Sequence, residues 1–177
     1  MTQMDSSEIR DVMDLYGFAT DTRRWDLFDR VFSKNLHADY GGEAAWTDLE
    51  QFKNDFEAFH AVLDSSNHLM ANCISDIKGD KAACVTYGHW VLVRSGMRDG
   101  DKWFGYGWYD DELSRESEGW RITRRKLRMI SWEGNSNILN PAGDVPDDSF
   151  KVPIDVTSLY AESEAGTIPL LKSIDGD

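Results

Sequence analysis

The sequence has little of what defines several large classes of protein. Two cysteines, Cys73 and Cys84, occur among its 177 residues, too few for a disulfide framework. They fit small buried positions in a reducing cytosol. No apolar run approaches the roughly 18 residues of a membrane span, and the polar start MTQMDSSEIRD lacks the pattern of a signal peptide. The sequence therefore predicts a cytoplasmic protein with no membrane partner.

Basic charge is also scarce. The chain has 19 Lys and Arg against 32 Asp and Glu, a formal net charge of −13. Nucleic acids need a basic patch, so no nucleic-acid partner is expected. The four histidines are scattered without an HExxH or CxxC spacing, and no GxGxxG or GxxxxGK[ST] stretch stands between a strand and a helix. These absences predict a site with no metal and no cofactor.

What the sequence does have is enough apolar material for a core. Hydrophobic residues make up 41% and aromatic residues 12% of the chain, which fits one folded domain. The acid is unevenly spread, because residues 133–177 hold nine Asp or Glu and two Lys. Three of the four prolines lie between Pro141 and Pro153. This predicts a domain at 1–132 and an acidic, proline-containing, irregular C-terminal extension at 133–177.

Apolar residues at helical spacing predict three helices in the first third of the chain. The first contains the stripe in residues 9–16, and the second is TRRWDLFDRVF. Asp21 lies between them, at the end of the first helix or at the cap of the second. The third begins at a capping box of Thr47 and Glu50 and carries apolar residues as far as Leu63.

From residue 68 onward apolar residues recur at every second position, which is the spacing typical of β-strands. Strands are predicted at 68–77, 82–95, 102–114 and 120–132, separated by the turns KGDK, RDGD and ESEG. Glycines inside these strands favour a bent sheet. Helices followed by a meander of long strands predict an α+β fold, in which a strongly curved antiparallel sheet carries three helices on its concave side.

Three stretches together resemble a known family. They are YGFATDTRRWDLFDRVFSKNLHADYGG, NHLMANCISDIKGDKAACVTY and GYGWYDDELSRESEGWRITRRKL. The chain over residues 8–132 is similar to the SnoaL-like group of the NTF2-like superfamily, which includes scytalone dehydratase, the bile-acid dehydratase and hexachlorocyclohexane dehydrochlorinase. The resemblance implies a cone-shaped α+β barrel and a His–Asp pair that removes a proton from carbon. Asp21 and His68 match this pair, and Tyr16 matches a pocket position.

The chemistry explains why such a pair is useful. Imidazole is a base near neutral pH, and a carboxylate that accepts one ring N–H fixes the tautomer and stabilises the imidazolium. Regular alternation along the strand puts His68, Met70, Asn72 and Ile74 on one face, which we expect to line a pocket. A developing enolate needs a neutral hydrogen-bond donor. The candidates for this role are Tyr16, Asn72, Tyr87 and His89.

Further residues are expected to bind an apolar substrate. Trp25 and Trp108 belong to an aromatic set that suits a flat or polycyclic molecule, although the same residues could fill the core. Arg128 is included because the resemblance implies that an arginine of the last strand reaches the pocket in some relatives. The rest of the basic run RRKLR is expected on a solvated surface.

The candidate site residues could also have purely structural roles. Asp21 could be only a helix cap, and His68 a satisfied histidine at a strand edge. The facing of His89 is open because a bulge at Gly88 would reverse it. His37 and His60 are expected on the surface or in an interface.

The sequence therefore predicts a cofactor-independent lyase of the dehydratase type that acts on a small, hydrophobic, cyclic substrate. A related isomerase or cyclase would use the same base. The alternative from another class is a non-catalytic ligand-binding or structural subunit, because fold alone does not decide function. Apolar residues in the extension, a wide sheet and the resemblance predict a homodimer or homotrimer.

Overall fold

The computed structural model describes residues 3–144, 152 and 154–176. The N-terminal part forms helices and two strands, in the order α1 (Gln3–Asp21), a 3-10 turn η1 (Trp25–Leu27), α2 (Phe28–Val31), β1 (Phe32–Asp39), β2 (Ala45–Trp46) and α3 (Leu49–His60). Four long strands follow: β3 (Ser65–Lys78), β4 (Lys81–Val93), β5 (Lys102–Glu116) and β6 (Gly119–Gly134). The chain then forms η2 (Ser136–Leu139), α4 (Leu159–Glu164) and α5 (Pro169–Asp175).

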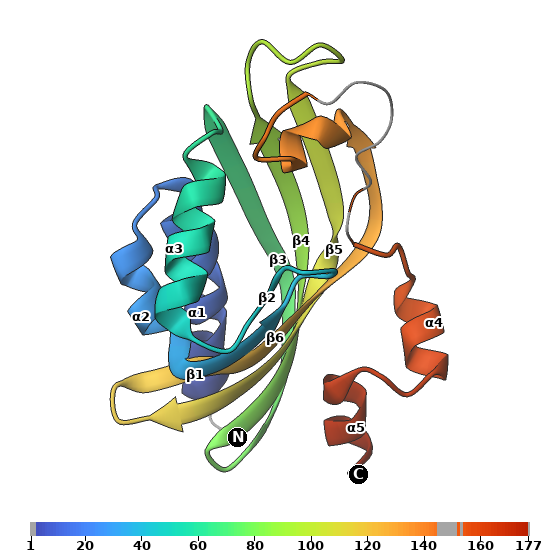
Figure 1. The fold of residues 1–177 in the computed structure, drawn as a ribbon. Helices are drawn as coiled ribbons and strands as arrows, with labels where there is room; N and C mark the ends of the chain where they lie inside the picture. The colour runs from blue at the N-terminus through green and yellow to red at the C-terminus, as the bar shows by residue number, and fades with distance from the viewer. Residues whose placement is uncertain (1–2, 145–151, 153, 177) are drawn as a thin grey trace.

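The strands build one open, curved sheet in the order β2-β1-β6-β5-β4-β3 (Figure 1). The strands β3 to β6 pair in antiparallel order, and β1 joins β6 in parallel. Helices α1, α2 and α3 lie on one side of the sheet, and α4 and α5 lie beyond the other (Figure 1). The predicted α+β fold is confirmed. Among the described helices, none combines the length and apolar character that crossing a membrane would require.

Local details of the helices differ from the predictions. The segment predicted as a second long helix is a 3-10 turn followed by the single turn α2, and Arg23 just before it has a φ of 55°. The N-cap of α3 is Asp48, whose side chain accepts a hydrogen bond from the N–H of Gln51. The predicted capping box at Thr47 was therefore placed one residue too early. Asp48 and Thr47 are both good caps, and sequence spacing alone does not choose between them.

The main core fills the space between the helices and the concave face. Aromatic residues of α1, α2 and α3 meet there, with Phe28 contacting both Phe52 and Phe56. Alternation along the strands puts Trp90, Tyr109 and the Arg125 side chain on this same face. The concave face is therefore the side of the sheet on which a pocket enclosed by helices can form.

The sequence predicted an irregular C-terminal extension, but the structure contains two short helices there, α4 and α5. Ile168 and Leu170, at the start of α5, pack with Ala83, Val85 and Trp108 on the convex face of the sheet. The short helices α4 and α5 thus cover part of the face opposite the main core (Figure 1). The prediction took the prolines of this segment as a sign of irregular structure. In α5, however, the proline lies in the first helical turn, where proline is tolerated.

Candidate active site

Asp21 and His68 are held together by two hydrogen bonds. Asp21 is the last residue of α1, and its carboxylate accepts from Nδ1 of His68 at 2.7 Å and from the His68 backbone N–H at 2.7 Å. Ser66 Oγ donates to the same carboxylate at 2.8 Å. Burial raises the pKa of Asp21, but these hydrogen bonds outweigh it and hold that pKa below its ordinary value. A carboxylate at this position fixes the His68 proton on Nδ1, so that Nε2 carries the lone pair.

The approach of α1 to β3 depends on Gly17. A Cβ atom at this position would lie 2.8 Å from the His68 carbonyl oxygen and 3.1 Å from Cγ of Met70. The distance to the backbone oxygen is closer than packed atoms allow, so a larger side chain would push the helix away from the strand. The missing side chain at Gly17 therefore lets the end of α1 bring Asp21 within reach of His68.

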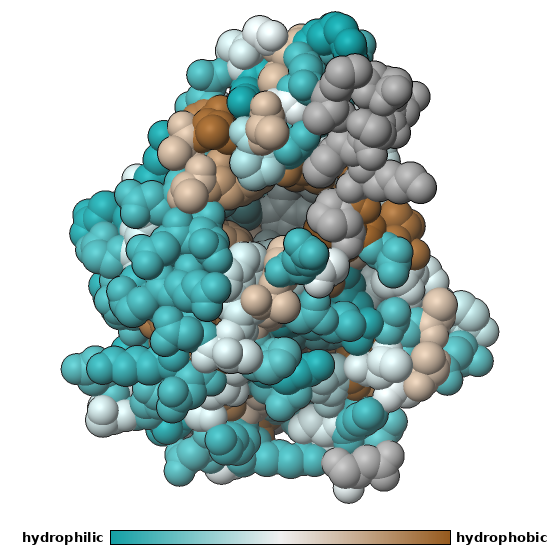
Figure 2. All heavy atoms as spheres, viewed as in Figure 1, coloured by the Kyte–Doolittle hydropathy of each residue, from teal (hydrophilic) through white to brown (hydrophobic). Residues whose placement is uncertain are grey.

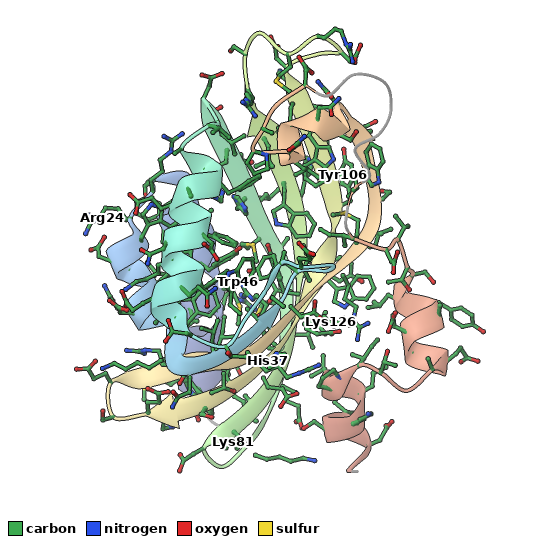
Figure 3. The ribbon with its side chains drawn as sticks, in the orientation of Figure 1. Arg24, His37, Trp46, Lys81, Tyr106 and Lys126 are labelled. Carbon is green, nitrogen blue, oxygen red and sulfur yellow. The ribbon has the colours of Figure 1, made fainter. Side chains whose placement is uncertain are left out.

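His68 lines a cavity of about 260 Å³ on the concave side of the sheet. Figure 2 shows a hollow in the middle of this face of the molecule, with apolar side chains along its upper border. The lining is mostly aromatic and aliphatic, and Trp46 lies at its edge beside α3 (Figure 3). Other lining residues are Ala44, Asp55, Phe56, Phe59, Trp90, Leu92, Trp103, Leu127, Met129, Leu139 and Ile154. A cavity with these walls suits a small apolar molecule.

Three tyrosine hydroxyls form the polar wall of the cavity. Tyr16 OH lies 3.1 Å from Tyr40 OH and 3.3 Å from Tyr109 OH, and all three residues line the cavity. Burial raises the pKa of each, so the hydroxyls stay protonated. Three hydroxyl protons serve two hydrogen bonds within the trio. One proton therefore remains to be donated to a bound molecule.

A buried ion pair stands behind the tyrosines. Arg125 donates from Nε and Nη2 to the two carboxylate oxygens of Asp111, at 2.8 and 2.7 Å, and both side chains are fully buried. The guanidinium lies 4.2 Å from the ring centroid of Tyr16 and 4.1 Å from that of Tyr109. Its charge lies against the faces of two rings, a cation–π arrangement that holds them in place.

His60 is a second histidine beside the site. It was expected on the surface or in an interface, but it is only 3% exposed within a single chain, and its ring centroid lies 6.2 Å from that of His68. Its Nδ1 lies 2.7 Å from the Phe56 carbonyl oxygen, and Nε2 has no hydrogen-bond partner among the described residues. The signal was present in the sequence, because His60 follows Phe56 by one helical turn and continues the buried face of α3.

The burial of His60 predicts a loss of stability in mild acid. Burial lowers its pKa to about 4, whereas an unfolded histidine titrates near 6.5. As the pH falls from 6.5 to 4, the unfolded state takes up a proton that the folded state does not. Stability attributable to His60 therefore falls with pH in this window, by about 3 kcal/mol in total.

Urea unfolding at pH 7 and pH 4.5 tests this effect. The His60→Phe variant is expected to lose about 2–3 kcal/mol less than the wild type between the two pH values. The exposed His37 offers a matched control, because His37→Phe should keep the wild-type pH dependence. Equal losses in the wild type and in His60→Phe would contradict the assignment.

Asn72 and Tyr87 lie away from the cavity and line a separate surface groove between α1 and the edge of the sheet. The register of β3 against β4 shifts between Ala71 and Ile74, and Asn72 has a φ of 49°. This β-bulge inserts one residue, so the alternation counted from His68 does not continue through Asn72 to Ile74. The prediction that Asn72 and Ile74 share the pocket face with His68 was wrong for that reason. Tyr87 was misplaced for a different one: it lies two residues before His89 on β4, so it shares the convex side with His89.

Four other predicted lining residues also lie elsewhere. His89 stacks on Tyr106 with ring centroids 4.6 Å apart on the convex side, and Trp108 is buried beneath α5. Arg128 also faces the convex side, where it is bonded to Asp110 and Glu162. Trp25 packs behind the cavity, against Phe28 and His60. Of the nine predicted site residues, the structure brings Asp21, His68 and Tyr16 together. Four further residues lie at or beside the site that the sequence analysis did not assign to it: Tyr40, Tyr109, Arg125 and His60.

The fold agrees with comparisons to known proteins. The sequence profile of the SnoaL-like domain matches residues 2–126, so the chain belongs to this family. The uncharacterized protein Rv2910c of Mycobacterium tuberculosis is 30% identical over 125 residues, which make up 68% of this chain and 82% of the relative.

Solved structures share the fold. The Kfla4162 protein of Kribbella flavida superposes with a TM-score of 0.72 at 23% identity, covering 77% of this chain and 97% of its own. A candidate scytalone dehydratase of Novosphingobium aromaticivorans superposes with a TM-score of 0.67 at 17% sequence identity, covering 73% of this chain and 86% of its own. The hexachlorocyclohexane dehydrochlorinase LinA, type 2, superposes with a TM-score of 0.65 at 12% sequence identity, covering 80% of this chain and 93% of its own. The predicted resemblance to the SnoaL-like group of the NTF2-like superfamily is confirmed.

Proposed function

We propose that this protein is a cofactor-independent lyase of the dehydratase type, with His68 as its base and Asp21 as the partner that orients the base. The observation that carries the proposal is the 2.7 Å hydrogen bond between Asp21 and Nδ1 of His68, beside an apolar cavity that His68 lines. Relatives by fold named as a dehydratase and as a dehydrochlorinase support elimination as the reaction type.

The proposed reaction starts on carbon next to a carbonyl group. Nε2 of His68 takes the proton, and the electron pair of the broken C–H bond moves into an enolate. The spare hydroxyl proton of the tyrosine trio hydrogen-bonds the enolate oxygen. When the enolate collapses, the C–O bond to the hydroxyl on the β-carbon breaks. This hydroxyl takes the proton from the His68 imidazolium and leaves as water. The products are an unsaturated ketone and neutral His68.

The cavity supports a small, apolar, cyclic substrate. Its walls are largely aromatic, and its volume of about 260 Å³ suits a molecule of one or two rings. The same base would also serve an isomerase or cyclase, because each of these reactions begins with the same proton transfer. A protein that only binds a ligand would leave the carbon-bound proton in place.

Proton exchange in D₂O tests the proposal without knowledge of the natural substrate. Bicyclic ketones and their β-hydroxy derivatives are incubated with the protein, and NMR follows deuterium entering beside the carbonyl while absorbance follows the unsaturated ketone. The wild type is expected to accelerate exchange, and His68→Gln to fall to the background rate. The exposed His37 provides the control variant His37→Gln, which should behave as wild type. Equal rates for His68→Gln and the wild type would overturn the mechanism.

We also propose that the chain assembles as a homodimer or homotrimer through the convex face of the sheet. Leu69, His89 and Tyr106 form a row across three strands there, and Leu69 is 57% exposed. Tyr106 lies on the side of the sheet away from α3 (Figure 3). Sedimentation velocity at micromolar concentration is expected to show two or three chains, and Leu69→Lys to shift the protein to one. A single 20.2 kDa species in the wild type would contradict this proposal.

A further inference from the structure

The two cysteines of the chain lie against each other beneath the edge of the sheet. Sγ of Cys73, on β3, is 3.3 Å from Sγ of Cys84, on β4, and both are free thiols. An S–S bond measures about 2.05 Å, so the two sulfurs would have to approach by a little over 1 Å. The two strands are already hydrogen-bonded neighbours in the sheet.

The β-bulge is what brings the two sulfurs together. Cys84 pairs with Ser75 in the register of β3 and β4, so a regular strand would not place Cys73 beside it. Asn72 has a φ of 49°, a conformation that asparagine tolerates better than most residues. The extra residue turns Cys73 toward Cys84, and β3, as an edge strand with one neighbour, has room to adjust.

The two thiols differ in access and acidity. Cys73 is half-buried and lines the surface groove that also contains Arg10, whereas Cys84 is buried. The hydrogen bond from the Cys84 thiol, helped by the Thr86 hydroxyl, outweighs the opposing effect of burial and lowers the pKa of Cys73 to about 7. An accessible sulfur with thiolate character next to a buried thiol is the arrangement of a reactive and a resolving cysteine.

We propose that Cys73 and Cys84 are a redox pair, which a hydroperoxide oxidises to an intrachain disulfide. The Cys73 thiolate attacks one peroxide oxygen, so that an S–O bond forms and the O–O bond breaks. The peroxide is reduced to water or an alcohol, and Cys73 becomes a sulfenic acid. Cys84 then attacks the Cys73 sulfur, the S–S bond forms, and the sulfenic oxygen leaves as water with the proton of Cys84.

Hydrogen peroxide and intact-mass spectrometry test the pair in the full-length protein. After treatment at pH 7 with one equivalent of peroxide, the wild type is expected to lose the mass of two hydrogens, and dithiothreitol should restore them. Peptide mapping should join Cys73 to Cys84 within one chain. Cys84→Ser should stop at a sulfenic acid on Cys73 that dimedone captures, and Cys73→Ser should leave Cys84 unmodified.

Urea-unfolded wild type is the comparison that isolates the folded geometry. The disulfide is expected to form more slowly there, because unfolding removes both the contact between the sulfurs and the hydrogen bond that favours the Cys73 thiolate. Three outcomes would overturn the proposal: a disulfide between chains, modification of Cys84 before Cys73, or a native protein that reacts no faster than the unfolded chain.

Discussion

We expect the Asp111→Asn variant to lose about 3–5 kcal/mol of its free energy of unfolding. The substitution keeps the size of the side chain but removes the charge that Arg125 faces at 2.7 Å. Both side chains are fully buried, so water cannot replace the lost carboxylate. The uncompensated guanidinium, and not the loss of a favourable ion pair, accounts for most of the expected cost.

Two further variants separate this effect from a general sensitivity of the sheet. Glu112 and Arg124 are the neighbouring cross-strand pair on β5 and β6, but their side chains are 47% and 41% exposed. Glu112→Ala should therefore cost less than about 1 kcal/mol in the same urea titration. The double variant Asp111→Leu with Arg125→Met should recover most of the stability, because no charge is left buried. A stable Asp111→Asn would contradict the argument.

The double variant also separates folding from the site. Arg125 packs on the rings of Tyr16 and Tyr109, so its loss should leave the tyrosine trio less well held. We expect near-normal stability with reduced exchange activity in this variant. That combination would identify Arg125 as a positioning residue for the tyrosines, because a purely structural role would restore both properties together.

The sequence predicted the fold well because its helical and strand periods are long and regular. It also selected Asp21 and His68, which the structure finds hydrogen-bonded. The face of Arg128 was harder to predict. Alternation puts Arg125 and Arg128 on opposite faces, but periodicity alone does not tell which face holds the cavity. Only the pairing of Arg128 with Asp110 and Glu162 on the convex side decides it.

The bulge in β3 had an even weaker signal. Asn72 has the only feature that hints at it, a side chain that tolerates a positive φ, and asparagine has many other uses in strands. A single inserted residue changes the face of all later residues, which is why Asn72 was misplaced and why the contact between the two cysteines was not foreseen. Tyr40 and Tyr109 were missed for a different reason: tyrosines in a core and in a site look alike until their hydroxyls are placed.

The largest effect on activity is expected at His68. His68→Gln keeps a side chain of similar length with hydrogen-bonding capacity but removes the base, so kcat on a responsive ketone should fall by about 10²–10⁴-fold. Asp21→Asn should also be severe. An amide oxygen can still accept from Nδ1, but it does not fix the productive tautomer as a carboxylate does, and it does not stabilise the imidazolium. Circular dichroism and urea unfolding of both variants check that the fold persists.

The combination of the two substitutions is the sharper test of how they work. Because Asp21 acts on the substrate only through His68, it has nothing left to orient once the imidazole is gone. The double variant should therefore be about as slow as His68→Gln alone, and the two losses in kcat should not multiply. Ser66→Ala serves as a control, since it removes one hydrogen bond to the Asp21 carboxylate while leaving both bonds from His68, and it should cost far less. If instead the losses at Asp21 and His68 multiply, the carboxylate contributes to the reaction by a route that does not pass through the histidine, and the proposed division between base and orienting partner is wrong.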